Sequence, residues 1–565
     1  MRLNGGQMIC QALLNEGVDT VFGIPGGAIM PLYQTLPQYP GLRHILVRHE
    51  QGAAMAADGY GRVTGNVGVC FATSGPGATN MVTGLAGAMM DSVPVVAITG
   101  QVTREAIGKD AFQETDVTGV TLPVLKHNYL VMTAAELPRV LKEAFYLARS
   151  GRPGPVLVDV PKDVFVEEAE FEYPETVELP GYPPPTYGDE ESVKRAAELI
   201  AEAKRPVIMA GHGIIISQAY KELQEFAEKG QFPVSTTLLG ISSFKTDHVL
   251  NIGLPGMHGS AFASHAINDC DLLIGLGMRF DDRVTSKVSL FAPRAKVIHV
   301  DIDPAELGKN VRPTVGIVGN VKHVLEQLTP LVERADRREW LAHIDQLRTK
   351  HPLWLEDGDN QIRPQDVIQQ ISDMTDGKAI IATGVGQHQM WAAQLYNFQE
   401  YNSFITSGGL GSMGYEVPSA MGAQVGEPDR VVWTFAGDGG FQMTMMELAT
   451  MVENHIPVKI ALINNFSLGM VRQWQDIFYN HDYVATLYTG NPDFVKLAEA
   501  FGMKGIRATK KDEVGPAVKE AMAWDGPALV DFQVEMSENV YPFIPPGTGV
   551  AAMVEDPRLV ERRAV

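Results

Sequence analysis

One stretch, residues 437–465, constrains the fold of this chain more than any other. It reads GDGGFQMTMMELATMVENHIPVKIALINN. The apolar run Val431–Ala436 leads into it, and a second apolar run, Val458–Ile463, lies near its end. Between the two runs, apolar residues from Met445 to Val452 recur at helical spacing. This order of strand, helix and strand predicts a parallel crossover in an α/β sheet.

A polar residue follows each predicted strand. Asp438 lies in the turn Gly437-Asp438-Gly439, and Asn465 ends the Asn-Asn pair. The carboxyl ends of parallel strands share one edge, where ligands bind in open α/β sheets, and hard oxygen ligands beside a helix N-terminus suit Mg²⁺ and a diphosphate. Each motif alone is equally compatible with ordinary turn chemistry. Together, GDG and an NN pair 24 residues later form the diphosphate signature of thiamine diphosphate (ThDP) enzymes.

Charge and composition exclude several classes of partner. The 565 residues suggest three or four domains, and 67 acidic against 46 basic residues give a net charge of −21. That charge argues against nonspecific binding to nucleic acid or to an anionic membrane. We find neither a signal peptide nor an apolar run long enough to span a membrane. The three cysteines form no disulfide framework, so we expect a cytoplasmic protein.

Strand-like and helical stretches alternate along the chain and are interrupted by two linkers. The first linker holds five prolines in YPETVELPGYPPPTYG, and the second is polar. The predicted fold class is α/β, with three domains that each contain a mainly parallel sheet flanked by helices. We expect the tail to be an arm closing over a site or a partly mobile end. The predicted segments are domain 1–172, linker 173–188, domain 189–345, linker 346–363, domain 364–535 and tail 536–565.

Three further motifs point to ligands. The Gly-rich turns GIPGGA and TSGPGATN allow a backbone to approach a ligand closely, although tight connections in α/β folds use the same residues. Glu50 follows Arg48-His49 in a first helical turn, where a carboxylate is often merely a favourable partner of the helix dipole. GLGSMG at Gly409–Gly414 matches the dinucleotide fingerprint formally. It lacks the following strand and acidic residue, so we interpret it only as a close approach to some ligand.

The ordered motifs resemble one family over nearly the whole chain: the catalytic subunit of acetohydroxyacid synthase, also called acetolactate synthase. In that family a pyrimidine-binding ThDP domain, a central FAD-carrying domain and a domain that binds diphosphate and Mg²⁺ follow one another, which agrees with the predicted linkers. Beyond the GDG and NN pair, the matching stretches are FGIPGGAIMPLY, RHEQGAAMAADGYGR, ATSGPGATN, DAFQETD, SGRPGPVLVDVPKD, GMHG, RFDDRVT, GVGQHQMWAAQ, GLGSMG and GMVRQWQ.

The resemblance assigns the ThDP site. Glu50 matches the residue that bonds N1′ of the pyrimidine, where a carboxyl favours the imino tautomer that takes the C2 proton of the thiazolium. Asp438, Asn465 and the backbone carbonyl of Ser467 match the Mg²⁺ ligands. Met413 matches an apolar wedge between the two rings of the cofactor. The other implied contacts are Pro76, Asn80, Val385, Gly386, Gln387, His388, Gly411, Gly437 and Gly439.

The resemblance also assigns the substrate side. Arg283 matches the residue that receives the carboxylate of the second 2-oxo acid, although without the resemblance a structural ion pair with Asp281 or Asp282 in RFDDRV would be favoured. Trp474 matches the residue that favours an ethyl over a methyl group, a preference worth about 1–3 kcal/mol. Met470 resembles an apolar neighbour in that pocket. Gly27, Ala28, Phe112, Gln113 and Lys162 match the approach to C2, with Gly27 and Gln113 as candidate donors to oxyanions.

FAD is the third implied cofactor, although the net reaction contains no redox step. His258 alone would be interpreted as a turn histidine, but the surrounding GMHG supports a flavin contact. The positions that match FAD contacts in the family are Arg152, Gly211, Gly213, Thr237, Leu238, Met257, His258, Arg279, Arg283, Asp301 and Ile302.

The implied activity joins two molecules of pyruvate, or pyruvate and 2-oxobutanoate, with loss of CO₂. A hydroxyethyl carbanion formed on ThDP attacks the acceptor ketone to give 2-acetolactate or 2-aceto-2-hydroxybutanoate, precursors of branched-chain amino acids. A homodimer or homotetramer, with the active site between two catalytic subunits, and a small regulatory subunit are implied partners. The alternatives are an FAD-independent catabolic acetolactate synthase, a pyruvate oxidase, a glyoxylate carboligase, which Glu50 disfavours, and a noncatalytic homologue.

Four positions depart from the family pattern. Gly440 stands where Ser or Cys is usual, and Tyr415-Glu416-Val417 replaces Phe-Gly-Leu. Asn320 replaces a flavin-contacting Asp, and Thr103 replaces a Pro at the inhibitor-binding entrance. The first three make local cofactor contacts uncertain, and the last puts the sensitivity to those inhibitors in doubt.

Overall fold

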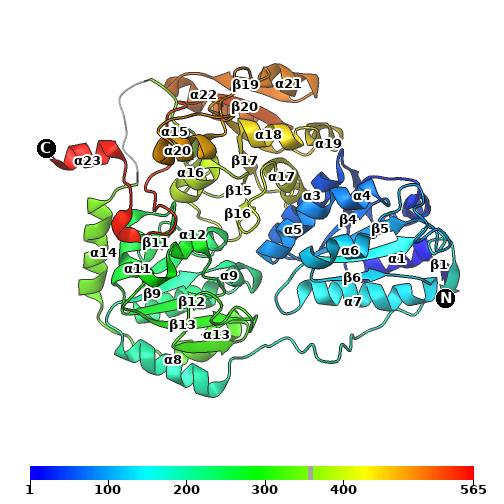
Figure 1. Ribbon diagram of the computed structural model, residues 1–565, viewed down its shortest axis with the longest axis horizontal. Helices are drawn as coiled ribbons and strands as arrows, with labels where there is room; N and C mark the ends of the chain where they lie inside the picture. The colour runs from blue at the N-terminus through cyan, green and yellow to red at the C-terminus, as the bar shows by residue number, and fades with distance from the viewer. Residues whose placement is uncertain (354–359, 565) are drawn as a thin grey trace.

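The computed structural model describes residues 1–353 and 360–564, apart from the side chains of 562–564. The described chain forms three α/β domains, each built around a six-stranded parallel sheet, so the predicted fold class is confirmed (Figure 1). No helix within the described ranges is long and apolar enough to cross a membrane.

The first domain has the strand order β3-β2-β4-β5-β7-β6. Its central strands are continuous apolar runs because helices cover both faces of the sheet. A short strand β1 (Arg2–Asn4) precedes the first helix and pairs antiparallel with β8 (Glu168–Glu170). The sheet strands are β2 (Thr20–Gly23), β3 (Arg43–Leu46), β4 (Gly68–Ala72), β5 (Val95–Gln101), β6 (His127–Leu130) and β7 (Val156–Pro161). The helices are α1 (Gly5–Asn15), α2 (Met30–Thr35), α3 (Glu50–Thr64), α4 (Pro76–Asn80), α5 (Val82–Asp91), α6 (Val117–Thr121) and α7 (Leu137–Arg149).

The central domain has the order β11-β10-β9-β12-β13-β14. Residues 173–188, which lead into it, contain neither helix nor strand. The strands are β9 (Pro206–Ala210), β10 (Val234–Thr236), β11 (Asn251–Gly253), β12 (Leu272–Leu276), β13 (Lys296–Asp301) and β14 (Val315–Val318). The helices are α8 (Glu190–Glu202), α9 (His212–Ile216), α10 (Tyr220–Gly230), α11 (Ala261–Asp269), α12 (Asp282–Thr285), α13 (Val321–Leu328) and α14 (Arg338–Lys350).

The predicted second linker begins too early. Helix α14 continues to Lys350 because Trp340 and Ile344 on one face are buried, so the first part of the predicted linker 346–363 is helical. Residues 354–359 of that linker lie outside the described residues.

The third domain has the order β16-β15-β17-β18-β20-β19. Its strands are β15 (Ile380–Thr383), β16 (Phe404–Thr406), β17 (Val432–Gly437), β18 (Lys459–Asn464), β19 (Lys504–Ala508) and β20 (Ala528–Gln533). Its helices are α15 (Pro364–Met374), α16 (Gln387–Leu395), α17 (Glu416–Gly426), α18 (Asp438–Thr444), α19 (Glu447–Glu453), α20 (Gly469–Phe478), α21 (Phe494–Ala500) and α22 (Lys511–Ala523).

The stretch 437–465 forms the predicted parallel crossover. Strands β17 and β18 pair in parallel, with Gly437 opposite Ile463. The connecting segment differs in one respect from the single helix that its periodicity predicts. It forms two short helices, α18 and α19, separated at Met445 and Met446. Both polar ligand candidates nevertheless lie at the carboxyl edge of the sheet.

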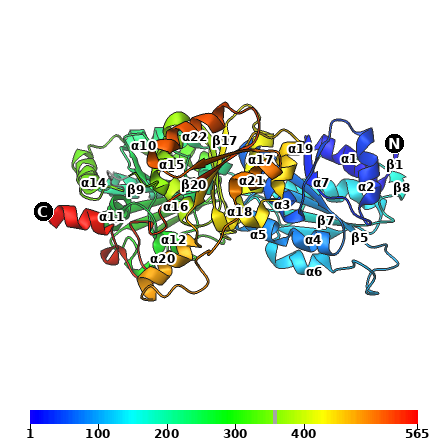
Figure 2. The same ribbon diagram turned by 90° about the horizontal axis from the view of Figure 1, so that it is seen from above.

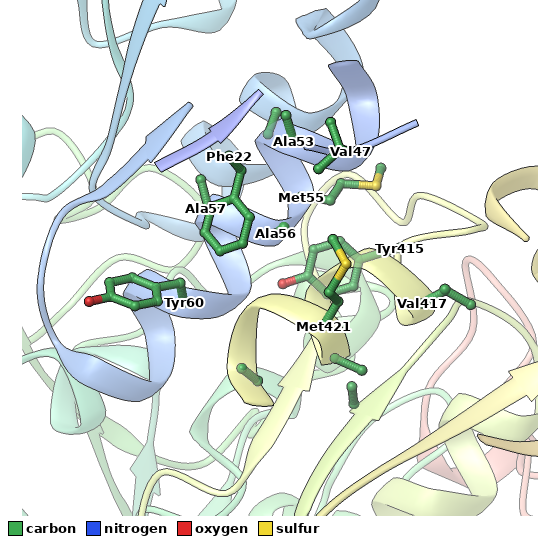
Figure 3. Packing of buried hydrophobic residues seen from close by; sticks show 14 of the residues in the cluster. Phe22, Val47, Ala53, Met55, Ala56, Ala57, Tyr60, Tyr415, Val417 and Met421 are labelled. Carbon is green, nitrogen blue, oxygen red and sulfur yellow. The ribbon is translucent and has the colours of Figure 1, made fainter. Parts of the chain in front are cut away.

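Helices α3 and α17 pack together and join the first domain to the third (Figure 3). Small residues make this close approach feasible: a Cβ on Gly59 would overlap the backbone of Ser419, and a Cβ on Gly422 would overlap the carbonyl oxygen of Ala56. Met55 and Met421 fill the space beside the contact within one shared apolar cluster. The two helices therefore form a direct contact between the first and third domains.

The tail crosses the third domain toward the central domain. Gln473 of α20 donates to the carbonyl oxygen of Val540 at 3.0 Å, and the amide of Ile544 donates to the carbonyl oxygen of Met257 at 2.9 Å. Phe543 lies against the ring of His258, with ring centroids 5.2 Å apart. The chain ends in helix α23 (Pro557–Ala564). The tail therefore contacts both the third and the central domain.

Candidate active site

The polar edge of the third sheet is buried. Asp438 begins α18 directly after β17, Asn465 follows β18, and their exposed fractions are 1% and 7%. Asn465 donates to Gln387 at 3.2 Å and accepts from the amide of Ser467 at 3.2 Å. Burial raises the pKa of Asp438 to about 7, against the lowering effect of a hydrogen bond from Asn491.

These donors fit Mg²⁺. The described residues contain no group of three or more His, Cys, Asp or Glu side chains able to hold a metal. The edge instead offers one carboxylate with amide and carbonyl oxygens, the hard-oxygen set that Mg²⁺ uses together with substrate phosphates and water. A nearby divalent cation would remove the electrostatic cost of the buried Asp438 carboxylate.

The same edge can receive a diphosphate. Helix α16 begins at Gln387, after Gly386 with φ 155°. The ring of His388 covers Gly437, where a Cβ would lie 2.8 Å from it. Burial lowers the pKa of His388 to about 4, so the ring is neutral, and its Nε2 is buried without a hydrogen-bond partner. The backbone amides of a helix start without a side-chain cap and an unpaired ring nitrogen suit an anionic group.

A cavity of about 910 Å³ opens beside this edge and reaches all three domains. Of the eleven predicted flavin positions, only Gly211 is absent from its lining. Gly211 instead packs against the backbone of Gly277, where a Cβ would clash. The volume suits a dinucleotide-sized ligand. The lining positions are Arg152, Gly213, Thr237, Leu238, Met257, His258, Arg279, Arg283, Asp301 and Ile302.

The lining of this cavity includes polar side chains that could contact a ligand. Burial lowers the pKa of His258 to about 3, and its Nδ1 has no hydrogen-bond partner. Burial raises the pKa of Asp301 to about 6. Arg152 from the first domain donates to Glu306 at 2.7 Å and pairs with Asp303 at 3.3 Å. The residues present therefore fit a flavin dinucleotide with polar and apolar parts.

Two predicted substrate-side residues of the third domain, Met470 and Trp474, border the same cavity. The predicted ThDP contacts Val385, Gly386, Gly411 and Met413 also line it. The side chain of Arg283 is 59% exposed, and its only ion pair is a loose contact of 3.6 Å with Asp282 among the described residues. The alternative of a structural ion pair for Arg283 is therefore weak, since an exposed pair at that distance contributes little.

The first domain holds a separate set of predicted residues. Glu50 is the first residue of α3 and accepts a hydrogen bond from Asn80 at 2.9 Å. Gly77 lies beside it, and a Cβ there would come within 3.3 Å of the carboxylate. Gln113, with φ 60°, lies against the Gly75 turn. The amide of Ala28 donates to Thr73 at 3.3 Å, so the two Gly-rich turns and Glu50 come together in one half-site.

The structure does not join this half-site to the cavity. Among the described residues that line the cavity, none of the first-domain set occurs; that set comprises Gly27, Ala28, Glu50, Pro76, Asn80, Phe112, Gln113 and Lys162. Figures 1 and 2 show α4 of the first domain and α20 on opposite sides of α17. Phe112 is 89% exposed, and no atom lies within 4 Å of a Cβ built on Gly27. One chain thus carries two separate half-sites. The first is the first-domain set around Glu50, and the second is the third-domain edge around Asp438 and Asn465, which lies beside the cavity.

Sequence reasoning missed two supporting residues. Glu447 of α19 is fully buried and accepts from the backbone amides of Arg48 and His49 at 3.0–3.1 Å, directly before Glu50. Asn491 donates to Asp438 at 2.7 Å. The acid among apolar residues in TMMELAT was a signal for Glu447. Asn491 in the turn NPD offered only a helix-start signal, through Asp493.

The structure shows where the residues that depart from the family pattern lie and what they contact. A Cβ on Gly440 would lie 2.6 Å from Glu416, so the glycine accommodates the larger neighbour. Both carboxyl oxygens of Glu416 are buried without a hydrogen-bond partner. Tyr415 donates to Asp58 of α3. Asn320 lines the cavity, and Thr103 is exposed in the loop after β5.

Comparison with known proteins agrees with the domain order. Three family models match: the N-terminal TPP binding domain of thiamine pyrophosphate enzymes over residues 3–120, their central domain over 193–328, and their C-terminal TPP binding domain over 384–532. These matches cover most of the chain. The N-terminal match contains Glu50, and the C-terminal match contains Asp438 and Asn465.

Three relatives match nearly the full length. Acetolactate synthase of Mycobacterium bovis is 50% identical over 559 residues, covering 97% of this chain and 90% of that protein. Acetolactate synthase isozyme 2 large subunit of Escherichia coli is 46% identical over 554 residues, covering 98% and 100%. Acetolactate synthase 1, chloroplastic, of Nicotiana tabacum is 46% identical over 559 residues, covering 96% and 83%. The chain is therefore a thiamine diphosphate-dependent enzyme that belongs to the acetolactate synthase family.

Proposed function

We propose that this enzyme joins two molecules of pyruvate, or pyruvate and 2-oxobutanoate, with loss of CO₂. The products are 2-acetolactate and 2-aceto-2-hydroxybutanoate, which serve branched-chain amino acid synthesis. The observation that carries the proposal is the cavity beside the buried Asp438–Asn465 edge, because Arg283 and Trp474 border it together. A cation and a flat apolar face in one cavity suit a short 2-oxo acid.

Asp438, Asn465 and the carbonyl of Ser467 would hold Mg²⁺, and the start of α16 would hold the diphosphate. When bound, ThDP supplies the carbanion chemistry that decarboxylation of a 2-oxo acid requires. Glu50 would bond N1′ of the pyrimidine and retain or release a proton there, and Asn80 orients its carboxylate. Met413 would support the ring from the apolar side.

Arg283 would bind the carboxylate of the acceptor. Its guanidinium is exposed enough in this structure to make a bidentate contact with a carboxylate. Trp474 would contact the alkyl group of the acceptor, and one extra methylene on its face contributes about 1–3 kcal/mol. Gly27 and Gln113 would donate to developing oxyanions, and Ala28, Phe112 and Lys162 would complete the entrance.

We further propose that the large cavity holds FAD. The ten lining residues described above, the unpaired Nδ1 of His258 and the close glycine contacts at Gly211 and Gly277 support this assignment. Since the net reaction transfers no electrons, the flavin would have a structural role. A pyruvate oxidase with the same residues would instead pass electrons to an acceptor.

We propose a homodimer or homotetramer in which the first domain of one chain meets the third domain of another. The separation of the two half-sites supports this arrangement, as do exposed apolar side chains beside each, such as Phe112 at 89% and Met443 at 51%. Because relatives are described as large subunits, a small regulatory subunit is the second proposed partner. The three buried free cysteines suit the cytoplasm.

The decisive experiment supplies purified protein with ThDP, Mg²⁺ and FAD and measures acetolactate formation from pyruvate. We expect product, and Glu50→Gln should abolish most of it while ThDP still binds. Absence of product from the fully loaded protein would refute the proposal. Reduction of an added electron acceptor would favour a pyruvate oxidase, an active but colourless protein would favour a catabolic acetolactate synthase, and condensation of glyoxylate would favour a glyoxylate carboligase.

A further inference from the structure

One loop packs against the Asp438–Asn465 edge that is proposed to bind Mg²⁺. Residues 486–491 follow α20 and are tied to the loop after β18 by backbone hydrogen bonds: Leu468 donates to Thr486 at 2.8 Å, and Tyr488 donates to Phe466 at 2.9 Å. Ser467 forms an isolated bridge with Leu487. The segment that carries two of the proposed metal ligands is therefore fastened to this loop.

Asn491 ends this loop, and both N–H groups and the oxygen of its side-chain amide have partners. One N–H donates to Asp438 Oδ2 at 2.7 Å, and the other donates to Asn464 Oδ1 at 3.0 Å. Its oxygen lies 3.5 Å from the Nε2 of Gln442, which also donates to the carbonyl oxygen of Asp438 at 2.9 Å. A single side chain thus connects the ends of β17 and β18, where the metal ligands follow.

The connection continues inside the sheet. Asn464 donates to Asp531 of β20 at 2.9 Å, and Arg507 of β19 donates to the other oxygen of Asp531 at 3.1 Å. Arg507 also pairs with Asp493, two residues after Asn491. The loop is therefore held on both sides of Asn491, and its amide has a defined orientation.

We propose that Asn491 is a positioning residue for the metal site. Its amide binds Oδ2 of Asp438, while the second N–H binds Asn464 directly before Asn465, so one side chain sets the spacing between the two strand ends. This inference rests on the proposed Mg²⁺ site. A carboxylate with one oxygen held by a neutral donor binds metal in one fixed direction, and loss of such an outer partner weakens metal affinity about 10- to 100-fold.

The test measures binding directly, with Mn²⁺ as the probe in the presence of ThDP. Electron paramagnetic resonance of free Mn²⁺ gives the Kd, and circular dichroism checks the fold. Asn491→Leu keeps the size of the side chain but removes both donors, and we expect its Kd for Mn²⁺ to rise about 10- to 100-fold. Asn491→Ser, which cannot reach both acceptors, should shift it in the same direction. The exposed Asn66→Leu in the first domain is the control and should match wild type.

Activity gives a second readout. At saturating Mg²⁺ the kcat of Asn491→Leu should recover toward the wild-type value, because the defect lies in metal affinity; a general structural defect would not be rescued in this way. Wild-type affinity in Asn491→Ser, folded and loaded with ThDP, would overturn the inference even if the leucine variant does not fold. A wild-type protein that binds no Mn²⁺ with ThDP would instead overturn the proposed metal site.

Discussion

At the scale of single residues, the third domain contains polar groups whose roles depend on burial. Glu447 is such a group, because it accepts hydrogen bonds from two backbone amides at the start of α3 and from Thr450 at 2.7 Å. It anchors the turn that presents Glu50, although the two residues belong to different domains. The position of the Glu50 carboxylate therefore depends on α19 as well as on its own helix.

Glu447→Ala should lower kcat. The substitution leaves the amides of Arg48 and His49 without a buried acceptor, which costs roughly 1–3 kcal/mol and lets Glu50 shift. We expect acetolactate formation to fall about 5- to 100-fold at saturating pyruvate and ThDP. Glu453→Ala on the same helix is the control, since Glu453 contacts Arg48 only through an exposed ion pair. Equal activity of both variants would contradict the anchoring role.

Glu416 introduces a pH dependence of stability. Burial raises its pKa to about 7, above the ordinary value of 4.5, so the folded chain binds more protons than the unfolded chain between these values. Stability therefore falls as pH rises through this range, and above it the ionised carboxyl costs up to about 3 kcal/mol. Glu416→Gln should raise the Tm of the cofactor-free protein at pH 8.5 and lose this advantage near pH 5. A pH-independent Tm difference would refute the assignment.

At the scale of elements, the contact between α3 and α17 depends on glycines, which have no side chain. Gly59 and Gly422 let each helix touch the backbone of the other, and Tyr415 and Asp58 add a hydrogen bond across the contact. The spacing of small residues in AAMAADGYG predicts a helix, but its partner, more than 350 positions later, is visible only in the structure. Helix propensity is a local property, whereas the closeness of two helices is set by both surfaces.

Gly422→Ala should destabilise the protein. The added methyl would overlap the carbonyl oxygen of Ala56, and overpacking of this kind costs about 1–3 kcal/mol, which outweighs the gain in helix propensity. Gly87→Ala in α5 is the matched control because no atom lies within 4 Å of the new Cβ, so it should be neutral or stabilising. Chemical denaturation measures both, and equal stability of the two variants would argue against the close contact.

At the scale of the whole molecule, the two half-sites lie apart in one chain. Glu50 and Asp438 belong to one polypeptide, yet the cavity beside Asp438 is not lined by any described residue of the Glu50 set. The proposed two-fold oligomer would resolve this separation, because each chain would then contribute one half of each site.

A mixture of inactive variants should regain activity. Glu50→Gln and Asp438→Ala each disable both sites of a homodimer, but a mixed dimer carries one site with an intact Glu50 and an intact Asp438. After unfolding and refolding of an equal mixture, we expect about a quarter of the wild-type activity from statistical pairing. Activity no higher than that of either variant alone would mean that each chain completes its own site.

The order of motifs along the sequence was enough to predict much of the fold of this protein. The GDG turn, the apolar runs and the NN pair predicted the parallel crossover and the metal edge, because strand period, turn chemistry and ligand type are all local. The tertiary structure alone decided how α18 and α19 divide, why Gly440 accompanies Glu416, and that Glu447 and Asn491 form hydrogen bonds with residues far away in sequence. Those features depend on distances between distant segments, which no local pattern specifies. The separation of Glu50 from Asp438 belongs to the same class, since it follows from how whole domains pack.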